Sequence, residues 1–369
     1  MEDRVIRVLQ IVPNMRSAGI ENFIMNFYKT INRDEVQFDF LVHSNQEQEF
    51  DSEITKLGGK IYRLTYKDDK NILKYIKDLN NFFKNHSEYD IVHGEMQSMM
   101  PLYLSIAKKN GVSIRIAHAH NSSYEKTLKG FILHLFSRFS KYPANVFWAC
   151  SNSAGKYLFG NKKYEIIYNA IDIEKFKYNE DIREKLRKEM NLENKMVIGN
   201  VARFELQKNH EFLIDVFEKI VQKNDNAILL LIGDGYLKEK IKNIVIQRGL
   251  SKYVIFTGVR KNVNELYQAM DLFLLPSLYE GLPLVGVEAQ ISGLNCFFST
   301  SITKEIEVSE KVKFLSLQSS SCEWADIILQ NQENCRICNV NDSYNLQIES
   351  KKLIKKYKNL LNKNGGDHK

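Results

Sequence analysis

The chain has 369 residues, of which 44% are hydrophobic and 26% are charged, and it carries a net charge of +7. This length and apolar content are enough for two hydrophobic cores and predict two domains of ordinary size. No apolar run reaches the roughly 18 to 20 residues that a membrane-spanning helix needs, which excludes an integral membrane protein. The modest charge comes with no recognised nucleic-acid-binding motif, so we expect no nucleic-acid partner.

The cysteine content indicates a reducing compartment. The chain has five cysteines and no secretory signal after Met1, which predicts a cytoplasmic protein. Cys335 and Cys338 form one C-x2-C pair, but neither a second pair nor a histidine cluster accompanies it. We therefore interpret this pair as chance and predict neither a zinc site nor a redox site.

The N-terminal half alternates between strand-like and helix-like patterns. Apolar runs predict strands at 5–12, 38–42, 91–93, 113–117, 146–150 and 165–168. Helical periodicity lies between several of these runs, at 21–31, 72–83 and 102–109. This alternation predicts a parallel sheet with helices on its faces.

Residues 126–142 combine apolar and basic side chains, in a region (101–178) with 12 basic and 4 acidic groups. The apolar members are Leu128, Phe131, Ile132, Leu135, Phe136 and Phe139, and the basic members are Lys126, Lys129, Arg138 and Lys141. Two interpretations are open. The segment is either an amphipathic basic helix on an anionic membrane surface or an ordinary surface helix with its apolar face on the core.

The C-terminal half repeats the alternation, with strands expected at 197–201, 227–232, 254–256, 272–275 and 296–298. We place the boundary near Asn179, which gives a first domain of residues 1–178 and a second of residues 179–345. A tail of residues 346–369 contains a final basic helix from Lys351 to Asn362. Two such sheets, with loops at the carboxyl ends of their strands, would form one cleft between them.

Two carboxylates stand eight residues apart around a Gly/Pro turn, at Glu280 and Glu288, directly after an apolar run. A helix that starts near Pro283 leaves its first N–H groups unpaired, and such an end binds phosphate. Carboxylates accept hydrogen bonds from vicinal hydroxyls. The run therefore suits a ligand with hydroxyls on both sides of a phosphate, as in a sugar nucleotide.

Two cations follow the strand expected at 196–201. Arg203 and Lys208 lie on the loop at its carboxyl end, where open α/β sheets bind ligands. Together they could neutralise a diphosphate, and the charge that grows on a leaving phosphate makes them most useful in the transition state.

These motifs resemble, in order along the chain, the retaining glycosyltransferases of the GT-B fold in the large family 4. The C-terminal motifs are Arg203 with Lys208, Leu231-Ile232-Gly233-Asp234-Gly235, Phe256-Thr257-Gly258, and Glu280 with Glu288. The N-terminal motifs are Leu9-Gln10-Ile11-Val12 with Ala18-Gly19-Ile20-Glu21, His118-Ala119-His120-Asn121, and Ile167-Tyr168-Asn169-Ala170-Ile171-Asp172. The resemblance implies an α/β protein with two Rossmann-like domains facing across a cleft. It also implies that the C-terminal helix crosses back to the first domain.

The resemblance assigns roles to residues of this sequence. It implies that Glu280 binds donor-sugar hydroxyls, that Glu288 binds ribose hydroxyls, and that His120, rather than its neighbour His118, lies near the donor sugar. Ala18 stands where the family often has a second glycine. The implied catalytic set is His120, Arg203, Lys208 and Glu280. The donor-binding set is Gly19, Arg203, Lys208, Gly258, Val259, Arg260, Glu280, Gly281, Leu282, Pro283, Leu284, Val285 and Glu288.

The function implied is a retaining transfer of a hexose-type sugar from a nucleotide diphosphate donor, with UDP favoured, to a saccharide or lipid-linked acceptor. The motif wording is closest to bacterial capsular and exopolysaccharide enzymes at the inner face of the plasma membrane. No Asp-x-Asp occurs, so we expect no metal and no other cofactor. The alternatives are a GT-B sugar-nucleotide epimerase and a non-catalytic nucleotide-sugar-binding subunit of a transferase complex.

Overall fold

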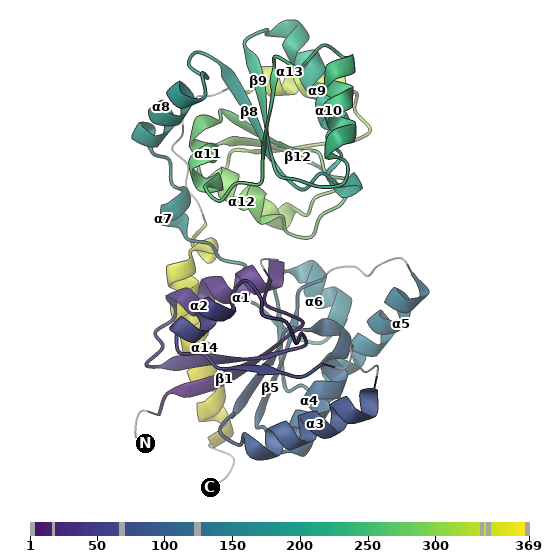
Figure 1. The fold of residues 1–369 in the computed structure, drawn as a ribbon, viewed down its shortest axis with the longest axis vertical. Helices are drawn as coiled ribbons and strands as arrows, with labels where there is room; N and C mark the ends of the chain where they lie inside the picture. Colours follow the sequence, from purple (N-terminus) through teal and green to yellow (C-terminus); the bar gives the residue numbers. More distant parts are fainter. Residues whose placement is uncertain are drawn as a thin grey trace. The chain divides into compact units, whose positions relative to one another are not determined.

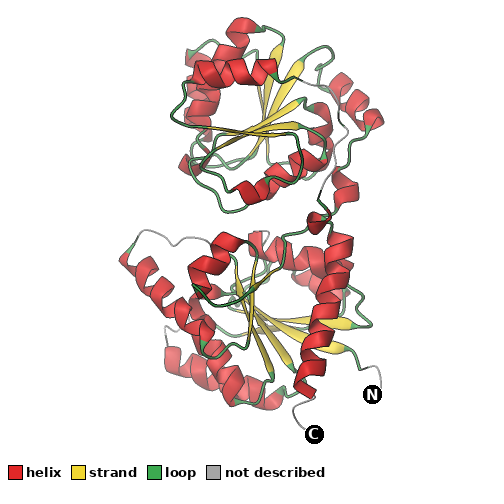
Figure 2. Ribbon diagram, turned by 180° about the vertical axis from the view of Figure 1, so that it is seen from behind, coloured by secondary structure: helices red, strands yellow, loops and turns green. Residues whose placement is uncertain are grey.

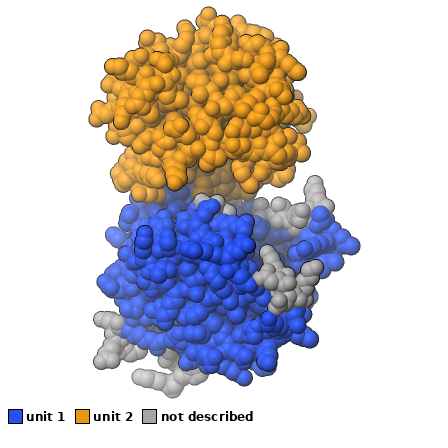
Figure 3. All heavy atoms as spheres, in the orientation of Figure 1, with its two compact units in different colours: residues 1–171, 343–369 blue, residues 172–342 orange. Residues whose placement is uncertain are grey.

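The computed structural model describes residues 4–16, 19–65, 71–121, 127–332, 336 and 341–365. The chain divides into two compact units, coloured separately in Figure 3. Unit 1 comprises residues 1–171 and 343–369, and unit 2 comprises residues 172–342, whereas the sequence placed the boundary near Asn179. Each unit is a parallel sheet between layers of helices (Figures 1 and 2), so the predicted architecture of two Rossmann-like domains is confirmed.

The described part of unit 1 has seven parallel strands in the order β3-β2-β1-β4-β5-β6-β7. They are β1 (Ile6–Val12), β2 (Val36–Val42), β3 (Ile61–Arg63), β4 (Ile91–Gly94), β5 (Ile114–Ala119), β6 (Val146–Ala149) and β7 (Glu165–Ile166). The order reverses between β1 and β4, because successive strands are added on opposite sides of this pair. Loops that leave the two strands diverge there, which opens the space where sheets of this kind bind ligands.

Helices cover both faces of this sheet (Figure 1). Val8 and Val12 of β1 belong to one core, and Leu9 and Ile11 belong to the other, as the two-residue period of a strand requires. Helices α1 and α14 contribute to the first core and α3, α4 and α6 to the second. The helices are α1 (Gly19–Thr30), α2 (Asp51–Lys56), α3 (Ile72–Asn85), η1 (Gln97–Met99), α4 (Met100–Lys109), α5 (Leu128–Ser137), η2 (Arg138–Lys141), α6 (Asn152–Phe159) and α14 (Leu346–Gly365).

Helix α14 ends the chain but belongs to the core of unit 1. Its Leu353, Ile354 and Tyr357 are buried, and the Tyr357 ring lies 6.0 Å from that of Phe38 on β2. The segment that leaves unit 1 and the segment that returns to it lie side by side. Ile171 of the first pairs with residues 344–346 of the second through two backbone hydrogen bonds of 3.0 and 3.1 Å.

The described part of unit 2 has six parallel strands in the order β10-β9-β8-β11-β12-β13. They are β8 (Met196–Val201), β9 (Ala227–Ile232), β10 (Val254–Gly258), β11 (Leu272–Leu275), β12 (Asn295–Ser299) and β13 (Val312–Leu315). The order reverses between β8 and β11. The flanking helices are α7 (Ile173–Phe176), α8 (Glu180–Glu189), η3 (Leu206–Lys208), α9 (His210–Lys223), α10 (Lys238–Gln247), α11 (Val263–Ala269), α12 (Leu284–Ile291), η4 (Lys304–Ile306), α13 (Ser321–Gln330) and η5 (Asp342–Tyr344), which ends across the boundary.

Two strands were missed in the sequence, β3 and β13. Each lies at an edge of its sheet, and of the seven residues of the two strands only Leu315 is buried, so neither forms a clear apolar run. Within the described residues, no helix combines the length and apolarity that a bilayer-crossing segment requires.

The packing of α14 gives a prediction about stability. Replacing Leu353 with Ala should lower the free energy of unfolding of unit 1 by roughly 2–5 kcal/mol, the usual range for a buried leucine. Chemical denaturation followed by hydrogen exchange should show the added exchange in residues 4–171 rather than in 172–342, although α14 follows unit 2 in the sequence. The control is Lys351→Ala on the exposed face of the same helix, which should change little. Equal loss of protection in both units would contradict the prediction.

Candidate functional site

Two loops of unit 2 leave the sheet where its strand order reverses. Residues 202–209 follow β8, and residues 276–283 follow β11, the strand paired with β8. Asn209, whose φ of 54° is in the left-handed region, donates from its side chain to the Pro276 carbonyl at 3.2 Å. We call these two loops the β8/β11 rim. It occupies the position at which open α/β sheets bind their ligands.

The rim brings Lys208 and Glu280 together. The Lys208 ammonium forms an ion pair with the Glu280 carboxylate, and the side chains are only 15% and 7% exposed. Gln207 donates from its side-chain amide to Glu280 Oε2 and to the Tyr279 carbonyl, both at 2.9 Å. Its main-chain carbonyl accepts a hydrogen bond from the Leu278 N–H at 2.8 Å. Two residues that are 72 positions apart therefore form one ordered charge pair on the rim.

The glycines of Leu231-Ile232-Gly233-Asp234-Gly235 allow the adjacent chain segment to support this rim. Gly233 has a φ of +139°, and a Cβ atom there would lie 2.0 Å from the Ala202 carbonyl oxygen. A Cβ on Gly235 would lie 2.6 Å from the Phe204 carbonyl oxygen. A side chain at Gly233 would therefore displace the start of the loop that carries Arg203 and Lys208.

Arg203 differs from Lys208 in its surroundings. Its side chain is 75% exposed and, among the described residues, is paired only with Glu205 of its own loop, at 3.1 Å. A long exposed guanidinium on a loop can change rotamer without disturbing the core. It can therefore reach an anionic ligand that approaches the rim.

Helix α12 starts at Leu284, with Pro283 as its N-cap and no side chain capping it. This agrees with the helix start expected near Pro283. The positive end of the helix dipole faces the loop that carries Glu280, so this helix end favours an anion at the rim.

Glu288 lies in α12, where the Tyr267 hydroxyl of α11 is 3.0 Å from its carboxylate. Burial raises the pKa of this carboxyl to about 7, although the Tyr267 hydrogen bond acts in the opposite direction. Near neutral pH the group therefore exchanges its proton easily and can switch from donor to acceptor.

The remaining predicted donor-binding residues of unit 2 lie on its loops. Gly258 ends β10 with a φ of 71°, and Val259 is 76% exposed. The Arg260 guanidinium donates to Asn262 at 3.3 Å. Gly281 is exposed, Pro283 is buried, and Leu282, Leu284 and Val285 are partly buried.

Two of the predicted site residues, Gly19 and His120, lie in unit 1, at the start of α1 and just after β5. Gly19 starts α1 and has open space where a Cβ would be, and Ala18 lies outside the described residues. His118 lies near the carboxyl end of β5 and is fully buried. His120 follows the strand directly, and its side chain is 7% exposed. Their ring centroids are 4.2 Å apart, as expected for two residues on one side of a strand.

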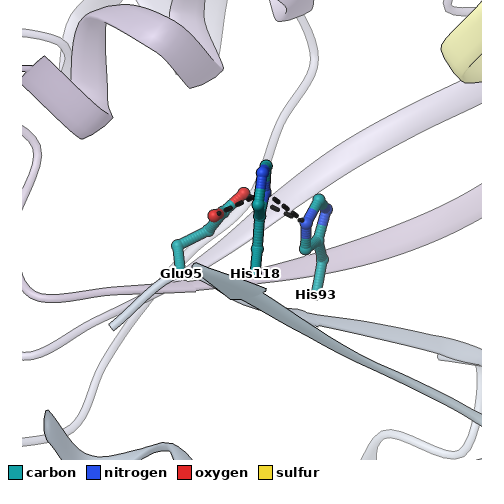
Figure 4. A group of neighbouring side chains, drawn as sticks. All are labelled: His93, Glu95 and His118. Atoms are coloured by element: carbon teal, nitrogen blue, oxygen red, sulfur yellow. Dashed lines mark hydrogen bonds and ion pairs between the residues drawn. The ribbon is translucent and has the colours of Figure 1, made fainter. Parts of the chain in front are cut away.

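The structure places two further titratable residues against these histidines, and Figure 4 shows them with His118. His93 on β4 and Glu95 just after it are buried, and Glu95 Oε2 accepts hydrogen bonds from His118 Nδ1, at 3.1 Å, and from His120 Nε2. His93 Nε2 lies 3.1 Å from His118 Nδ1 and 3.3 Å from Glu95 Oε1. Sequence analysis missed His93 and Glu95. The sequence signal for them was the presence of His93 and Glu95 at the end of the apolar strand β4. This strand pairs with β1 where the strand order reverses.

One potential ligand atom from each of His93, Glu95 and His118 lies within 4.8 Å of the other two, a spacing that a metal ion could also bridge. Glu95 Oε2 is already engaged by two imidazoles, so we interpret the group as a hydrogen-bonded cluster. Cys335 and Cys338 lie outside the described residues. Asp271 accepts hydrogen bonds from Arg183 and Arg187, so its role in the structure is an ion pair within unit 2.

Helix α5 and the turn η2 present an apolar surface. Ser137 is the one buried residue of α5 in the structure as described. Seven large apolar side chains are between 38% and 77% exposed: Leu128, Phe131, Ile132, Leu135, Phe136, Phe139 and Tyr142. Lys129 and Arg138 are exposed among them, and Lys126 lies outside the described residues. The apolar face is therefore not packed on the core, and we call it the α5 surface.

Both halves of the chain match family models. Residues 17–175 match the model described as Glycosyltransferase Family 4, and residues 181–336 match Glycosyl transferases group 1.

Relatives extend over nearly the whole chain. "Putative glycosyltransferase EpsF" of Bacillus subtilis is 33% identical and covers 87% of this chain and 86% of its own length. The capsular polysaccharide biosynthesis glycosyltransferase CapH of Staphylococcus aureus is 30% identical and covers 92% and 94%. An Escherichia coli enzyme, UDP-Gal:alpha-D-GlcNAc-diphosphoundecaprenol alpha-1,3-galactosyltransferase, is 27% identical over 62% of each chain.

Solved structures share the fold. Anabaena Alr3699/HepE in complex with UDP and glucose has a TM-score of 0.72 at 18% identity and covers 94% of this chain and 95% of its own. A glycosyltransferase from Rickettsia africae has a TM-score of 0.75 at 13% identity and covers 97% and 99%. Taken with the relatives and the two family models, this fold leads to one assignment: the chain belongs to glycosyltransferase family 4, with a C-terminal domain of the glycosyl transferases group 1 type and the GT-B fold.

Proposed function

We propose that the protein is a retaining glycosyltransferase that moves a hexose-type sugar from a UDP-sugar to a saccharide or lipid-linked acceptor in surface polysaccharide synthesis. The observation that carries the proposal is the Lys208–Glu280 ion pair on the β8/β11 rim. The loop that carries Glu280 leads directly into the start of α12, which has no side-chain cap. A cation, a hydroxyl-binding carboxylate and an anion-binding helix end are the three groups that a sugar diphosphate needs.

The relatives support the choice of donor and pathway. CapH is named for capsular polysaccharide biosynthesis, and the Escherichia coli relative is named for UDP-Gal and a diphosphoundecaprenol-linked acceptor. HepE, which shares the fold, was crystallised with UDP and with UDP-glucose. A lipid-linked acceptor would place the reaction at the inner face of the plasma membrane.

In the proposed reaction, the bond between the anomeric carbon and the diphosphate oxygen breaks. The acceptor hydroxyl oxygen bonds to the same face of that carbon, and the departing diphosphate takes the acceptor's proton. Lys208, Arg203 and the first N–H groups of α12 stabilise the charge that grows on the diphosphate. These groups take the role that a divalent ion has in other transferases, so the proposed transfer is metal-independent.

The ion pair gives Lys208 and Glu280 linked roles. Before the donor binds, each side chain neutralises the other in a largely buried setting. A diphosphate supplies Lys208 with a second anionic partner, which leaves lone pairs of Glu280 available to donor-sugar hydroxyls. Gln207 keeps the carboxylate in place through its 2.9 Å hydrogen bond. Glu288 takes the ribose hydroxyls, and His120 of unit 1 contacts the donor sugar.

The Lys208 role can be tested with a charge-removing variant. Lys208→Met keeps the apolar stem and should lower kcat by about 10²–10³-fold, because the lost charge acts mainly in the transition state. The assay is release of the nucleotide diphosphate from a panel of UDP-, GDP- and ADP-sugars with an acceptor extract. Lys223→Met is the matched control, since Lys223 forms an exposed ion pair with Asp326 on α13. Unchanged turnover in Lys208→Met would refute the role, and a changed sugar without an acceptor would indicate an epimerase.

The raised pKa of Glu288 predicts pH-dependent nucleotide binding. With a pKa of about 7, Glu288 is largely protonated at pH 6 and ionised at pH 8, and only the carboxylate accepts from both ribose hydroxyls. UDP affinity measured by calorimetry should therefore rise as pH rises through 7. Glu288→Gln should bind about 10- to 100-fold more weakly at pH 8, as for a lost hydrogen bond to a charged group, and should lose this pH dependence. Glu310→Gln, an exposed carboxylate of unit 2, is the control. A rise that persists in Glu288→Gln would assign it to another group.

The α5 surface fits an anionic membrane. Its exposed apolar side chains can enter the headgroup region, while Lys129 and Arg138 meet lipid phosphates. Such contact would bring unit 1 to a lipid-linked acceptor.

Vesicle sedimentation tests this surface. The protein should bind vesicles that contain anionic lipid, and bind less as salt increases. Ile132→Ser and Phe139→Ser should each weaken binding by about tenfold, because burying such a side chain is worth roughly 1.5–3 kcal/mol. Leu73→Ser removes a side chain that is 75% exposed on α3 and should have no effect. Equal binding of all variants would exclude the α5 surface as the contact.

A further inference from the structure

The hydrogen-bonded cluster of unit 1 centres on one carboxylate. Glu95 is 1% exposed, and imidazoles of His93, His118 and His120 surround it. His120, with a 7% exposed side chain, is the least enclosed of the three histidines. It is also the one that the proposed function places at the donor sugar, so the partner of its Nε2 controls how the ring is presented.

A buried carboxylate needs a compensating charge or several hydrogen bonds. Burial alone would raise the pKa of Glu95, but the three imidazoles hold it well below its usual value. Burial lowers the pKa of His93 to about 3 and also lowers that of His118, so both are neutral donors or acceptors. The positive charge opposite Glu95 therefore lies on His120.

Other elements also face His120. Glu21 of α1 is buried; burial raises the pKa of its carboxyl, and the nearby His120 acts in the opposite direction. Cys150, just after β6, donates from its thiol to the His120 carbonyl at 3.5 Å. The Phe23 ring of α1 packs edge-on against the imidazole, with centroids 5.3 Å apart. Burial lowers the pKa of His120, but Glu95 and Cys150 outweigh it and raise it to about 10.

We infer that Glu95 is a positioning residue for the transfer reaction, which holds the His120 imidazole in one orientation and as a hydrogen-bond donor at both nitrogens. This inference rests on the proposed function. Because Nε2 donates to Glu95, Nδ1 is the nitrogen that can donate to a hydroxyl of the donor sugar. A cationic ring at that place also favours the transition state, in which negative charge gathers on the leaving diphosphate.

The cluster is anchored from its far side by the last helix of the chain. The Tyr357 hydroxyl of α14 lies 2.8 Å from His93 Nδ1, and Tyr357 is fully buried. The path of polar contacts therefore runs from Tyr357 through His93 and His118 to Glu95 and His120. Tyr357 and His118, which are distant from His93 in the sequence, hold the His93 ring in place. The ring in turn restricts the position of the Glu95 carboxylate beside it.

The first test observes His120 directly. Long-range proton–nitrogen NMR spectra of ¹⁵N-histidine protein, assigned with His120→Gln, report the protonation of each ring nitrogen. In the native protein, His120 should remain doubly protonated from about pH 6 to about pH 9, and in Glu95→Gln its pKa should fall toward the ordinary value of about 6.5. Titration of native His120 near 6.5 would overturn the inference. This measurement needs no donor, so it stands even if the proposed function fails.

The second test is kinetic. Glu95→Gln should lower kcat by about tenfold to a hundredfold, the range for a lost hydrogen bond to a charged group, and should change the donor KM much less. The ratio of native to variant kcat should grow as pH rises, because only the variant loses the His120 proton in that range. A ratio that is constant with pH would show that Glu95 has a merely structural role.

Asp39→Asn provides the matched control. Asp39 is a fully buried carboxylate of unit 1 that accepts from Arg7 at 2.7 and 2.8 Å and from the Tyr89 hydroxyl at 2.7 Å. It should lower stability without altering the pH dependence of kcat, and a pH-dependent effect there would count against the inference. Metal analysis of the purified protein completes the set. Stoichiometric zinc that is lost in Glu95→Gln would overturn the inference, because Glu95 would then be a ligand rather than the partner of His120.

Discussion

The structure depends on one topological constraint, the reversal of strand order in each parallel sheet. All strands of a unit run in the same direction, so every loop that follows a strand emerges at the same edge. Where the order reverses, two neighbouring loops lead away in opposite directions and leave room between them. In unit 2 the loops after β8 and β11 carry Lys208 and Glu280, and in unit 1 the segment after β4 carries Glu95.

Buried charge is neutralised locally in both units. Asp39 is met by Arg7, Asp271 by Arg183 and Arg187, and Glu95 by imidazoles. Among the site residues described above, Arg203 on the rim is a cation that stays largely exposed, paired with Glu205 of its own loop. Asp39 and Asp271 are therefore paired within the scaffold, whereas Lys208 and Arg203 have partners that a diphosphate can replace.

The sequence predicted what depends on local pattern and motif. Apolar runs identified the central strands, and the spacing of Glu280, Pro283 and Glu288 indicated a strand, a turn and a helix start, all of which the structure contains. Glu95 could not be found in this way, because its role depends on β4 lying beside β5, a pairing between distant segments. The exposure of the α5 surface was likewise unpredictable, since an apolar helical stripe has the same pattern whether or not another element covers it.

The return of α14 to unit 1 has a consequence for biosynthesis. Unit 2 is one continuous stretch, residues 172–342, and holds all its strands as soon as that stretch has left the ribosome. Unit 1 is begun first but lacks part of its core until Leu353, Ile354 and Tyr357, which follow unit 2 in the sequence, have been synthesised. One apolar face of the nascent N-terminal sheet therefore remains partly uncovered while unit 2 is synthesised and folds. The fixing of His93 by Tyr357 therefore comes only after the whole of unit 2 has been synthesised.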